Sequence, residues 1–457
     1  MNKTVFALLV MIVFIVTCLS FAEGTTEILS WDSWKYQLRE DGTIEIEEYI
    51  GEEEQVEIPA EIDGKAVTAL GRFGWNKCKE IIIPDSIIAI EQNPFTSCNY
   101  LTNIILSEKS PFVFHDGSLF EKANNRLISY LEGFEEKEYS VPEGTLIIGK
   151  SAFSSNNYLR RVILPESVVE IQDSAFCDCL ELRELSIPSE VSVIEDFTFH
   201  GCESLKDITI PSGVISIGKD AFWYCSSLKS ITLPESLKTI GEDAFSCCRQ
   251  LSTISIPNSV TDIVGNPFTG CDNLKTIHVL PDHSVLAVID NVLFSKTEKK
   301  LICYPYALTN KKYEIPKGIK IIGEEAFSSC YDLKEITIPD TVIVIENRAF
   351  ESMGKLKSII IPASVQSVGN SAFSSCGWLE DVVIQEGVSS IGYNAFSRCS
   401  CLKTISVPSS VIDIGSGAFD NCEKLTVSIT EGSYAEKYCK ENRVNYTYPG
   451  VNDWLNN

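Results

Sequence analysis

The chain has 457 residues, 44% of them hydrophobic, which is enough apolar material for a continuous core and excludes a disordered polymer. Its 63 acidic and 38 basic side chains give a net charge of −25, which argues against nucleic acid or anionic lipid as the main partner. This charge is typical of a well-solvated surface, with a basic partner or diffuse binding of divalent ions as the alternatives.

Residues 1–22 have the pattern of a secretory signal peptide. Lys3 supplies the positive charge, an apolar stretch runs from Val5 to Val16, and Ser20-Phe21-Ala22 offers small residues for cleavage. We therefore expect cleavage after Ala22 and a mature protein that is secreted or displayed at the cell surface. A lipoprotein site at Cys18 is the alternative, but Thr17 stands where a smaller residue is expected.

No second stretch of eighteen apolar residues occurs downstream, so the sequence predicts no integral membrane span. Residues 23–62 are expected to form an N-terminal β cap. Within them, the segment from Trp34 to Ile46 predicts a hairpin around Asp41-Gly42 that covers the first of the sequence repeats, which begin at residue 63.

A 23-residue period organises residues 63–106, 142–281 and 316–430, which together hold thirteen repeats. An aromatic side chain stands eleven residues after the position that proline usually fills. The prolines are Pro84, Pro142, Pro165, Pro188, Pro211, Pro234, Pro257, Pro316, Pro339, Pro362 and Pro408. The aromatic residues are Phe73, Phe95, Phe153, Phe176, Phe199, Phe222, Phe245, Phe268, Phe327, Phe350, Phe373, Phe396 and Phe419.

The repeat unit reads I-P-x-x-V-x-x-I-G-x-x-A-F-x-x-C-x-x-L-x-x-I-x, and each of its parts predicts a local structure. Apolar and polar residues alternate from Leu205 to Ile210, which predicts a half-buried strand that Pro211 ends. Gly218 permits a tight turn, and Ala221 and Phe222 are expected on a short helical turn.

One unit cannot fold alone. Ordering its 23 backbone residues costs roughly 25 to 45 kcal/mol, whereas burying its apolar side chains returns only about 10 to 15 kcal/mol. Contacts between stacked coils must supply the rest. The sequence therefore predicts a β-rich repeat solenoid with short helical turns.

Two similar segments, residues 107–141 and 282–315, interrupt the repeats. Each reads as two strands joined by a charged turn, so we expect a β-hairpin at the solenoid edge, with a spacer as its simplest role. Residues 431–457 form the expected C-terminal cap, with a short helix over Tyr434–Asn442 and a last strand over Val444–Tyr448.

The repeat unit, the N-terminal segment, the paired insertions and the closing segment Gly432–Tyr438 resemble the BspA-like leucine-rich-repeat family of bacterial surface proteins. The resemblance covers nearly all of the mature chain. It implies a curved right-handed solenoid, found on or released from cells, that adheres to host or matrix proteins. Departures are modest: Asn156 and Met353 replace the repeat cysteine, and the first repeat is one residue short.

Ten of the seventeen cysteines occupy one repeat column, which favours a ladder of buried free thiols over metal binding. Disulfides between neighbouring rungs are the alternative in an oxidising compartment. Cys439 lies off the column and is expected to be exposed or to pair with a cysteine of another chain. The column comprises Cys98, Cys179, Cys202, Cys225, Cys248, Cys271, Cys330, Cys376, Cys399 and Cys422.

No catalytic, cofactor or metal motif is present in the sequence. The pairs Cys177/Cys179 and Cys399/Cys401 lack zinc-site spacing, and the four histidines form no H-E-x-x-H motif. We therefore expect no enzyme activity, no cofactor and no metal site, with His278 and His283 as ordinary loop residues.

The outward residues of the predicted strands form the candidate binding face. Short Ser and Thr side chains dominate it, a lysine column runs beside them, and Ile360 with Val383 is the one outward apolar pair among these columns. The candidate residues are Asp207, Thr209, Ser230, Thr232, Thr253, Ser255, Thr276, Ser358, Ile360, Asp381, Val383 and Thr404.

The sequence thus predicts a monomeric surface or secreted protein that binds an extracellular protein or glycan through this face. The alternative is a passive structural or envelope spacer without a specific ligand.

Overall fold

The computed structural model describes residues 28–74, 77–96 and 98–448. The expected signal peptide, its cleavage site after Ala22 and the alternative lipoprotein site at Cys18 lie outside the described residues. The chain divides into two compact units. Among the described residues, the first unit comprises those from 28 to 123 and from 128 to 134, and the second comprises those from 124 to 127 and from 135 to 448.

The first unit begins with a five-stranded sheet in the order β1-β2-β3-β6-β5. β2 and β3 form the expected hairpin, in which the Arg39 amide donates to the Thr43 carbonyl at 2.9 Å across the Asp41-Gly42 turn. Trp34, Tyr49 and Phe73 are packed together in its core, with 5.4 Å between the Tyr49 and Phe73 ring centroids. The strands are β1 (Leu29–Trp31), β2 (Trp34–Leu38), β3 (Ile44–Tyr49), β5 (Glu61–Ile62) and β6 (Lys65–Leu70).

A parallel sheet, β4-β7-β8, carries the first repeats of this unit. A β9-β10 hairpin and a short 3-10 helix, η1 (Glu132–Phe134), come after it, and β11 is divided between the units, with residues 126–127 in the second and 128–130 in the first. The strands are β4 (Gln55–Glu57), β7 (Glu80–Ile82), β8 (Asn103–Ile105), β9 (Phe112–His115), β10 (Ser118–Glu121) and β11 (Arg126–Tyr130).

The second unit is a solenoid in which most coils contribute one strand to a long-strand row, and parallel pairs in this row are offset by about one repeat. Each strand comes from the L-x-x-I-x-I part of the repeat. The strands are β12 (Glu138–Ser140), β14 (Arg161–Ile163), β16 (Glu184–Leu185), β20 (Thr253–Ile256), β22 (Thr276–Val279), β26 (Lys312–Glu314), β28 (Glu335–Thr337), β30 (Ser358–Ile361), β32 (Asp381–Ile384), β34 (Thr404–Val407), β36 (Thr426–Ile429) and β37 (Tyr446–Thr447).

The expected strand over Leu205–Ile210 is only partly formed. Ile208 and Ile210 are buried and Thr209 is exposed, as the alternation predicts, but in this row only an isolated bridge between Thr209 and Thr232 is formed with the next coil. The pattern of side chains determines which residues are buried, whereas a strand also requires a hydrogen-bonded ladder, which these two coils lack.

A second, short-strand row lies after the proline of each coil. The Pro211 carbonyl accepts from the Val214 amide at 3.1 Å, and this turn leads into β18, which pairs in parallel with β19. The strands are β13 (Ile147–Ile148), β15 (Glu170–Ile171), β17 (Val193–Ile194), β18 (Ser216–Ile217), β19 (Thr239–Ile240), β21 (Asp262–Ile263), β27 (Ile321–Ile322), β29 (Val344–Ile345), β31 (Ser367–Val368), β33 (Ser390–Ile391) and β35 (Asp413–Ile414).

The third side of each coil carries the Ala-Phe pair, and we call it the turn row. A helical turn was expected here, but the turn row is not helical. Asp220 and Tyr224 flank this segment with positive φ angles of 51° and 58°. A left-handed residue every four positions prevents a continuous helix. The freed amides bond to the next coil instead, since Phe222 N donates to the Ala244 carbonyl at 2.8 Å and Tyr224 N to the Ser246 carbonyl at 2.8 Å.

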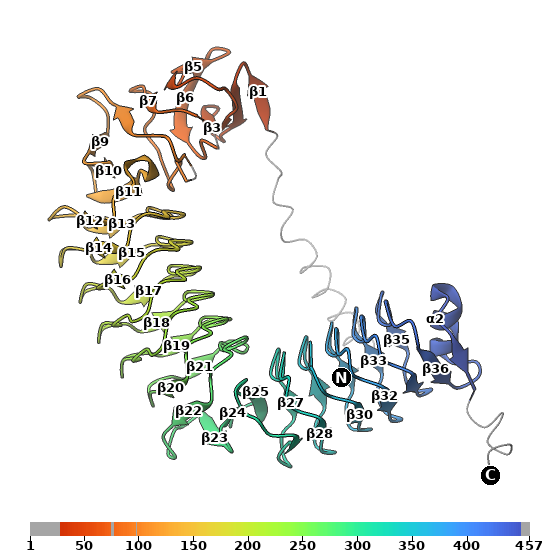
Figure 1. The fold of residues 1–457 in the computed structure, drawn as a ribbon. Coiled ribbons are helices and arrows are strands. Elements are labelled where there is room, and N and C mark those ends of the chain that lie inside the picture. Colours follow the sequence, from red (N-terminus) through yellow and green to blue (C-terminus); the bar gives the residue numbers. More distant parts are fainter. Residues whose placement is uncertain (1–27, 75–76, 97, 449–457) are drawn as a thin grey trace, which may run out of the picture. The chain divides into compact units, whose positions relative to one another are not determined.

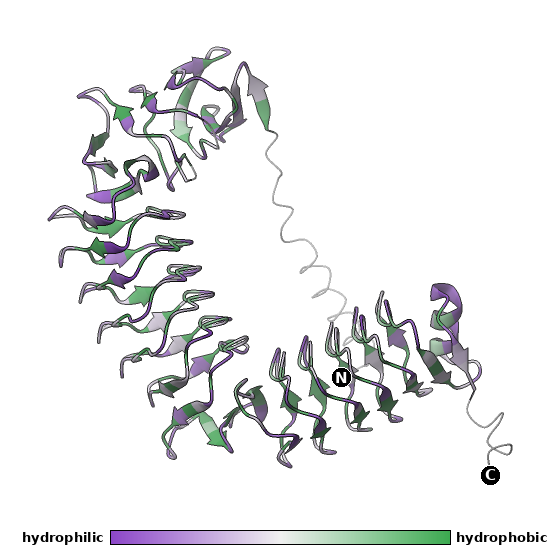
Figure 2. Cartoon of the chain, in the orientation of Figure 1, coloured by the Kyte–Doolittle hydropathy of each residue, from purple (hydrophilic) through white to green (hydrophobic). Residues whose placement is uncertain are grey.

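The Phe side chains form stacked ladders inside the second unit. Phe222 is fully buried, and its ring centroid lies 5.3 Å from that of Phe199 and 5.4 Å from that of Phe245. Figure 2 shows that hydrophobic and hydrophilic residues are interleaved along each coil. The apolar core therefore continues from coil to coil, as the solenoid prediction requires.

The cysteine column lines the same core with thiols. The Cys225 sulfur donates to the Phe199 carbonyl at 3.2 Å, and Cys248 makes the same contact with Phe222. The cysteines within the described residues are thiols rather than disulfides. Cys439 was expected to be exposed, but it is buried because it lies on the inner side of the C-terminal helix.

The second insertion has three strands of its own rather than two, β23 (Leu286–Ile289), β24 (Val292–Ser295) and β25 (Lys300–Cys303), and its last residues form β26 of the long-strand row. β25 pairs in parallel with β27, so the insertion ends as a rung of the short-strand row. His283 is a buried structural residue here, not an ordinary loop residue. Its Nδ1 accepts from the Val285 and Leu286 amides, at 3.2 and 3.1 Å, and its Nε2 lies 3.2 Å from the Pro257 carbonyl.

The expected closing helix is α2 (Tyr434–Asn442), which the Ser433 side chain caps by accepting from the Glu436 amide. Tyr438 packs edge-on against Phe419, the last ring of its ladder, with 5.8 Å between centroids. The expected last strand is reduced to β37, which pairs with β36. No helix in the described part of the chain is long and apolar enough to cross a membrane. Figure 1 shows the succession of coils from β12 to α2.

Candidate partner-binding face

The long-strand row presents the candidate residues to solvent. All twelve lie at outward positions, and eleven of them are exposed, with Thr276 half-buried. The neighbouring residues of the same strands, such as Ile359 and Val382, are buried. Alternation along each strand therefore produces a solvated face, although binding by this face stays a prediction.

Parallel pairing aligns these residues into columns. Ser358 lies beside Asp381, Ile360 beside Val383, and Asp381 beside Thr404. The Thr404 hydroxyl donates to the Asp381 carboxylate at 2.6 Å. The side chains of Ile360 and Val383 are 57% and 43% exposed, so the apolar pair is a real surface feature.

Charged side chains border the polar columns. The lysine column predicted from the sequence is exposed, and Lys403 forms an ion pair with Glu380 of the preceding coil. Their hydrogen bond raises the pKa of Lys403 and lowers the pKa of Glu380, which keeps both groups charged. The ion pair offsets the positive charge of this member of the lysine column.

A hollow of about 470 Å³ opens on this face beside the second insertion. Thr232, Ser255 and His278 line it from three successive coils, and Glu235 and Leu280 add a carboxylate and an exposed aliphatic side chain. Polar donors, one acid and an apolar surface thus meet in one concave place. This hollow contains two of the residues singled out from the sequence, together with His278, which was expected to be an ordinary loop residue.

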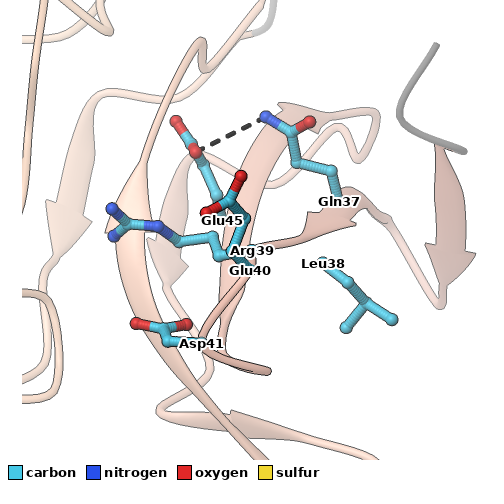
Figure 3. A pocket seen from close by; sticks show the side chains of 6 residues that line it. All are labelled: Gln37, Leu38, Arg39, Glu40, Asp41 and Glu45. Atoms are coloured by element: carbon cyan, nitrogen blue, oxygen red, sulfur yellow. Dashed lines mark hydrogen bonds between the residues drawn. The ribbon is translucent and has the colours of Figure 1, made fainter. Parts of the chain in front are cut away.

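A second hollow, of about 440 Å³, lies in the first unit on the β2-β3 hairpin (Figure 3). Three of its polar side chains already have partners. The Asp41 carboxylate accepts from the Thr43 amide at 2.9 Å and from its hydroxyl at 2.6 Å, and Gln37 Nε2 donates to Glu45 at 3.4 Å. These bonds stabilise the turn and give no support for a ligand site.

Sequence reasoning missed two features. Ile82 and Ile105 pair in register on β7 and β8 and form a second outward apolar pair, in the first unit. Cys177, Asp178 and His200 gather on the turn row of the second unit. The 23-residue separation of Cys177 and His200 was the available signal, because residues one repeat apart lie side by side.

Comparisons with known proteins agree with this architecture. The family model of the BspA type leucine rich repeat region matches in six copies, over residues 67–202, 131–225, 192–310 and 300–426. A search of curated proteins gives no significant match.

Two solved structures resemble the chain over most of their lengths. A leucine rich cell surface protein from Faecalibacterium prausnitzii is 28% identical, with 91% of this chain and 98% of that chain covered and a TM-score of 0.55. A leucine-rich repeat protein from Eubacterium ventriosum is 21% identical, with 89% and 84% covered and a TM-score of 0.51. The second likeness concerns the fold alone. Since the family model spans well over half of the residues, the chain belongs to the BspA type leucine-rich repeat proteins.

Proposed function

We propose that the protein works outside the cell as a binding protein, and that its long-strand row engages a protein or glycan partner. The observation that carries the proposal is the exposed Ile360/Val383 pair, which lies in register among short polar side chains. Apolar anchors surrounded by hydrogen-bonding groups are typical of the centre of a protein interface. The adhesive role implied by the family supports the same function, as does the similarity to a cell surface protein of Faecalibacterium prausnitzii.

The expected signal peptide and the absence of catalytic motifs in the sequence fit this role, so we propose a secreted or surface-displayed, non-enzymatic monomer. Its net charge of −25 disfavours nucleic acid as the partner. Sedimentation of the mature protein tests the monomeric state.

The test is binding of the mature protein to an array of matrix proteins and glycans. We expect the double variant Ile360→Glu/Val383→Glu to lose the signal, because two carboxylates replace the apolar anchor. A matched control is Val169→Glu/Ile215→Glu, which changes two aliphatic side chains of similar exposure, 49% and 48%, that lie outside the long-strand row.

Loss of binding in the first variant alone supports the proposal. Equal binding by both variants would contradict the assignment of this face. A wild-type protein that binds nothing on the array would favour the passive spacer.

A further inference from the structure

We propose that Cys177, Asp178 and His200 bind a transition-metal ion of the zinc type at the turn row of the second unit. The Cys177 sulfur lies 3.7 Å from His200 Nδ1 and 3.6 Å from Asp178 Oδ2, and Asp178 Oδ1 lies 3.6 Å from the same Nδ1. Among the described residues, these three form the one group of His, Cys and acidic side chains whose ligand atoms all lie close enough to hold one ion.

The separations between the donor atoms suit a tetrahedral ion. Zinc bonds of about 2.3 Å to sulfur and 2.0 to 2.2 Å to nitrogen and oxygen place tetrahedral donors about 3.3 to 3.6 Å apart. The sulfur-to-nitrogen separation of 3.7 Å lies close to this range, and the carboxylate approaches the sulfur through Oδ2 and the imidazole through Oδ1, each at 3.6 Å. A rotation of the Asp178 carboxylate would bring one oxygen towards both. An ion could therefore bind with only small side-chain movements.

The repeat brings the ligands together. Cys177 and His200 occupy the same position of successive coils, directly after the buried phenylalanine. Asp178 comes after Cys177 in a left-handed conformation with φ of 56°, and its amide donates to the His200 carbonyl at 2.6 Å. This hydrogen bond between the coils fixes the carboxylate beside the imidazole.

Gly201 makes room for the carboxylate. A Cβ atom at this position would lie 2.2 Å from Asp178 Oδ1, which no real contact allows. The positive φ of 71° does not explain the glycine, because Tyr224 occupies the equivalent position of the next coil with φ of 58°. Glycine at position 201, which has no side chain, therefore leaves the space that the Asp178 carboxylate occupies.

Trp223 holds the imidazole from the other side. Its ring stacks on His200 with 4.6 Å between centroids and an interplanar angle of 10°. Trp223 occupies the equivalent position one coil further on, so the three coils supply the thiol, the imidazole and the aromatic support in turn. This stacking restricts the orientation of the His200 ring.

The arrangement does not suit a cysteine nucleophile with a histidine base. In such a group the thiol and the carboxylate bond to opposite nitrogens of the imidazole. Here both face Nδ1, which is the convergence expected for ligands of one ion.

Thiolate and imidazole ligands favour zinc and its neighbours over calcium or magnesium. On binding, the Cys177 thiol would release its proton to solvent and its sulfur would become the ligand. Three protein ligands leave the fourth position open to water or to a group from a partner. The site lies on the turn row, so it does not depend on the proposed binding face.

Cobalt(II) titration of the reduced mature protein tests the proposal. We expect one equivalent to produce a thiolate-to-cobalt charge-transfer band and the strong visible bands of a tetrahedral ion, and zinc to displace both. Cys177→Ser and His200→Phe should abolish the bands, with His200→Phe keeping a ring beside Trp223. Gly201→Ala should weaken binding by about 10- to 100-fold, as changes around metal ligands typically do.

The matched controls are Cys247→Ser, which removes another half-buried thiol of the turn row, and His278→Gln, which removes an exposed histidine. Both should keep the wild-type spectrum, and circular dichroism should show every variant to be folded. Zinc should also raise the melting temperature of the wild type but not of Cys177→Ser. No spectrum in the wild type, a spectrum that survives Cys177→Ser or His200→Phe, or one that Cys247→Ser removes would overturn the site.

Discussion

Asp243 is a partly buried carboxyl group of the turn row, and its surroundings shift its pKa. Burial raises the pKa of this carboxyl to about 6, against the hydrogen bond from the Ser246 hydroxyl, and the charge of Glu325 acts in the same direction as burial. The residue adopts a left-handed conformation with φ of 53°. This position therefore favours an uncharged side chain on a residue that tolerates positive φ. Asparagine meets both conditions.

We expect Asp243→Asn to stabilise the protein at pH 7.5 by about 1 to 2 kcal/mol, once solvent screening of this partly exposed group is allowed for. The folded pKa lies above the ordinary 3.8, so the folded state holds the proton more tightly and wild-type stability falls as pH rises from about 4 to 6. Urea unfolding at pH 4 and 7.5 measures the difference, with exposed Asp207→Asn as the control. A variant that gains nothing at pH 7.5 would contradict the account.

Glu436 shows the opposite shift. Hydrogen bonds from Lys440, the Gly432 amide and the Tyr448 hydroxyl lower the pKa of its carboxyl to about 2. This group therefore stabilises the fold above its ordinary pKa of 4.5, and the contribution is lost as pH falls towards 2.

We expect Glu436→Gln to loosen the C-terminal cap, because three donors lose their charged acceptor. Hydrogen exchange of the α2 amides should be faster in the variant at pH 7, and the two proteins should become alike near pH 2. Lys437→Gln, an exposed change on the same helix, provides the control. Unchanged exchange in the Gln variant would show that the cap does not rely on this carboxylate.

Single residues were predictable from the sequence where the repeat alone determines their surroundings. The buried Phe and the outward Thr and Ser residues result directly from the period. Cys439 could not be placed, because its burial depends on how α2 lies against the last coil. The carboxylate of Asp178 was equally out of reach, since its direction depends on a left-handed backbone angle.

Among the elements, the stacked Phe rings of successive coils make the largest buried side-chain contacts between coils. Phe222 is in the middle of a ladder and stacks on two rings, whereas Phe419 ends its ladder with one stacked ring and the edge of Tyr438. Each removed ring leaves a cavity that the neighbouring coils cannot close without breaking their own hydrogen bonds.

We expect Phe222→Ala to cost about 3 to 5 kcal/mol of unfolding free energy and Phe419→Ala to cost less, because the end of the stack relaxes more easily. Guanidinium unfolding of the two variants gives the comparison. A greater loss in Phe419→Ala would mean that the capped end, not the middle, limits stability.

Elements were predictable in existence and order, and less so in hydrogen bonding. Alternation, turn residues and helix formers predict the strands, the N-terminal hairpin and α2. The prediction of a helical turn row was wrong because Ala and Phe spacing cannot reveal the left-handed residues at Asp220 and Tyr224. The first strand of each insertion, β9 or β23, was missed because Phe112–His115 and Leu286–Ile289 share no common pattern, whereas the two later strands of the insertions do.

At the scale of the molecule, each of the two units contains its own cluster of buried hydrophobic residues. One extends from Trp34 to Leu131 and another from Val292 to Cys439. Neighbouring coils stabilise one another, whereas distant coils share no contact, so unfolding need not be a single transition.

We expect scanning calorimetry to show more than one transition. Phe73→Ala should lower the temperature of one transition and Phe350→Ala that of another, because each removes a buried ring from a different core cluster. A single transition that both variants lower equally would mean that the chain unfolds as one cooperative body.

The left-handed corner residues have a practical consequence. Non-glycine residues such as Phe197, Tyr224 and Arg398 hold positive φ angles there, each at a cost of about 1 kcal/mol that stacking outweighs. Exchanging several of them for asparagine or glycine would relieve this cost without touching the buried ladders. The repeat thus offers a simple engineering route to a more heat-resistant scaffold, in which the same small improvement is made once per turn and added along the stack.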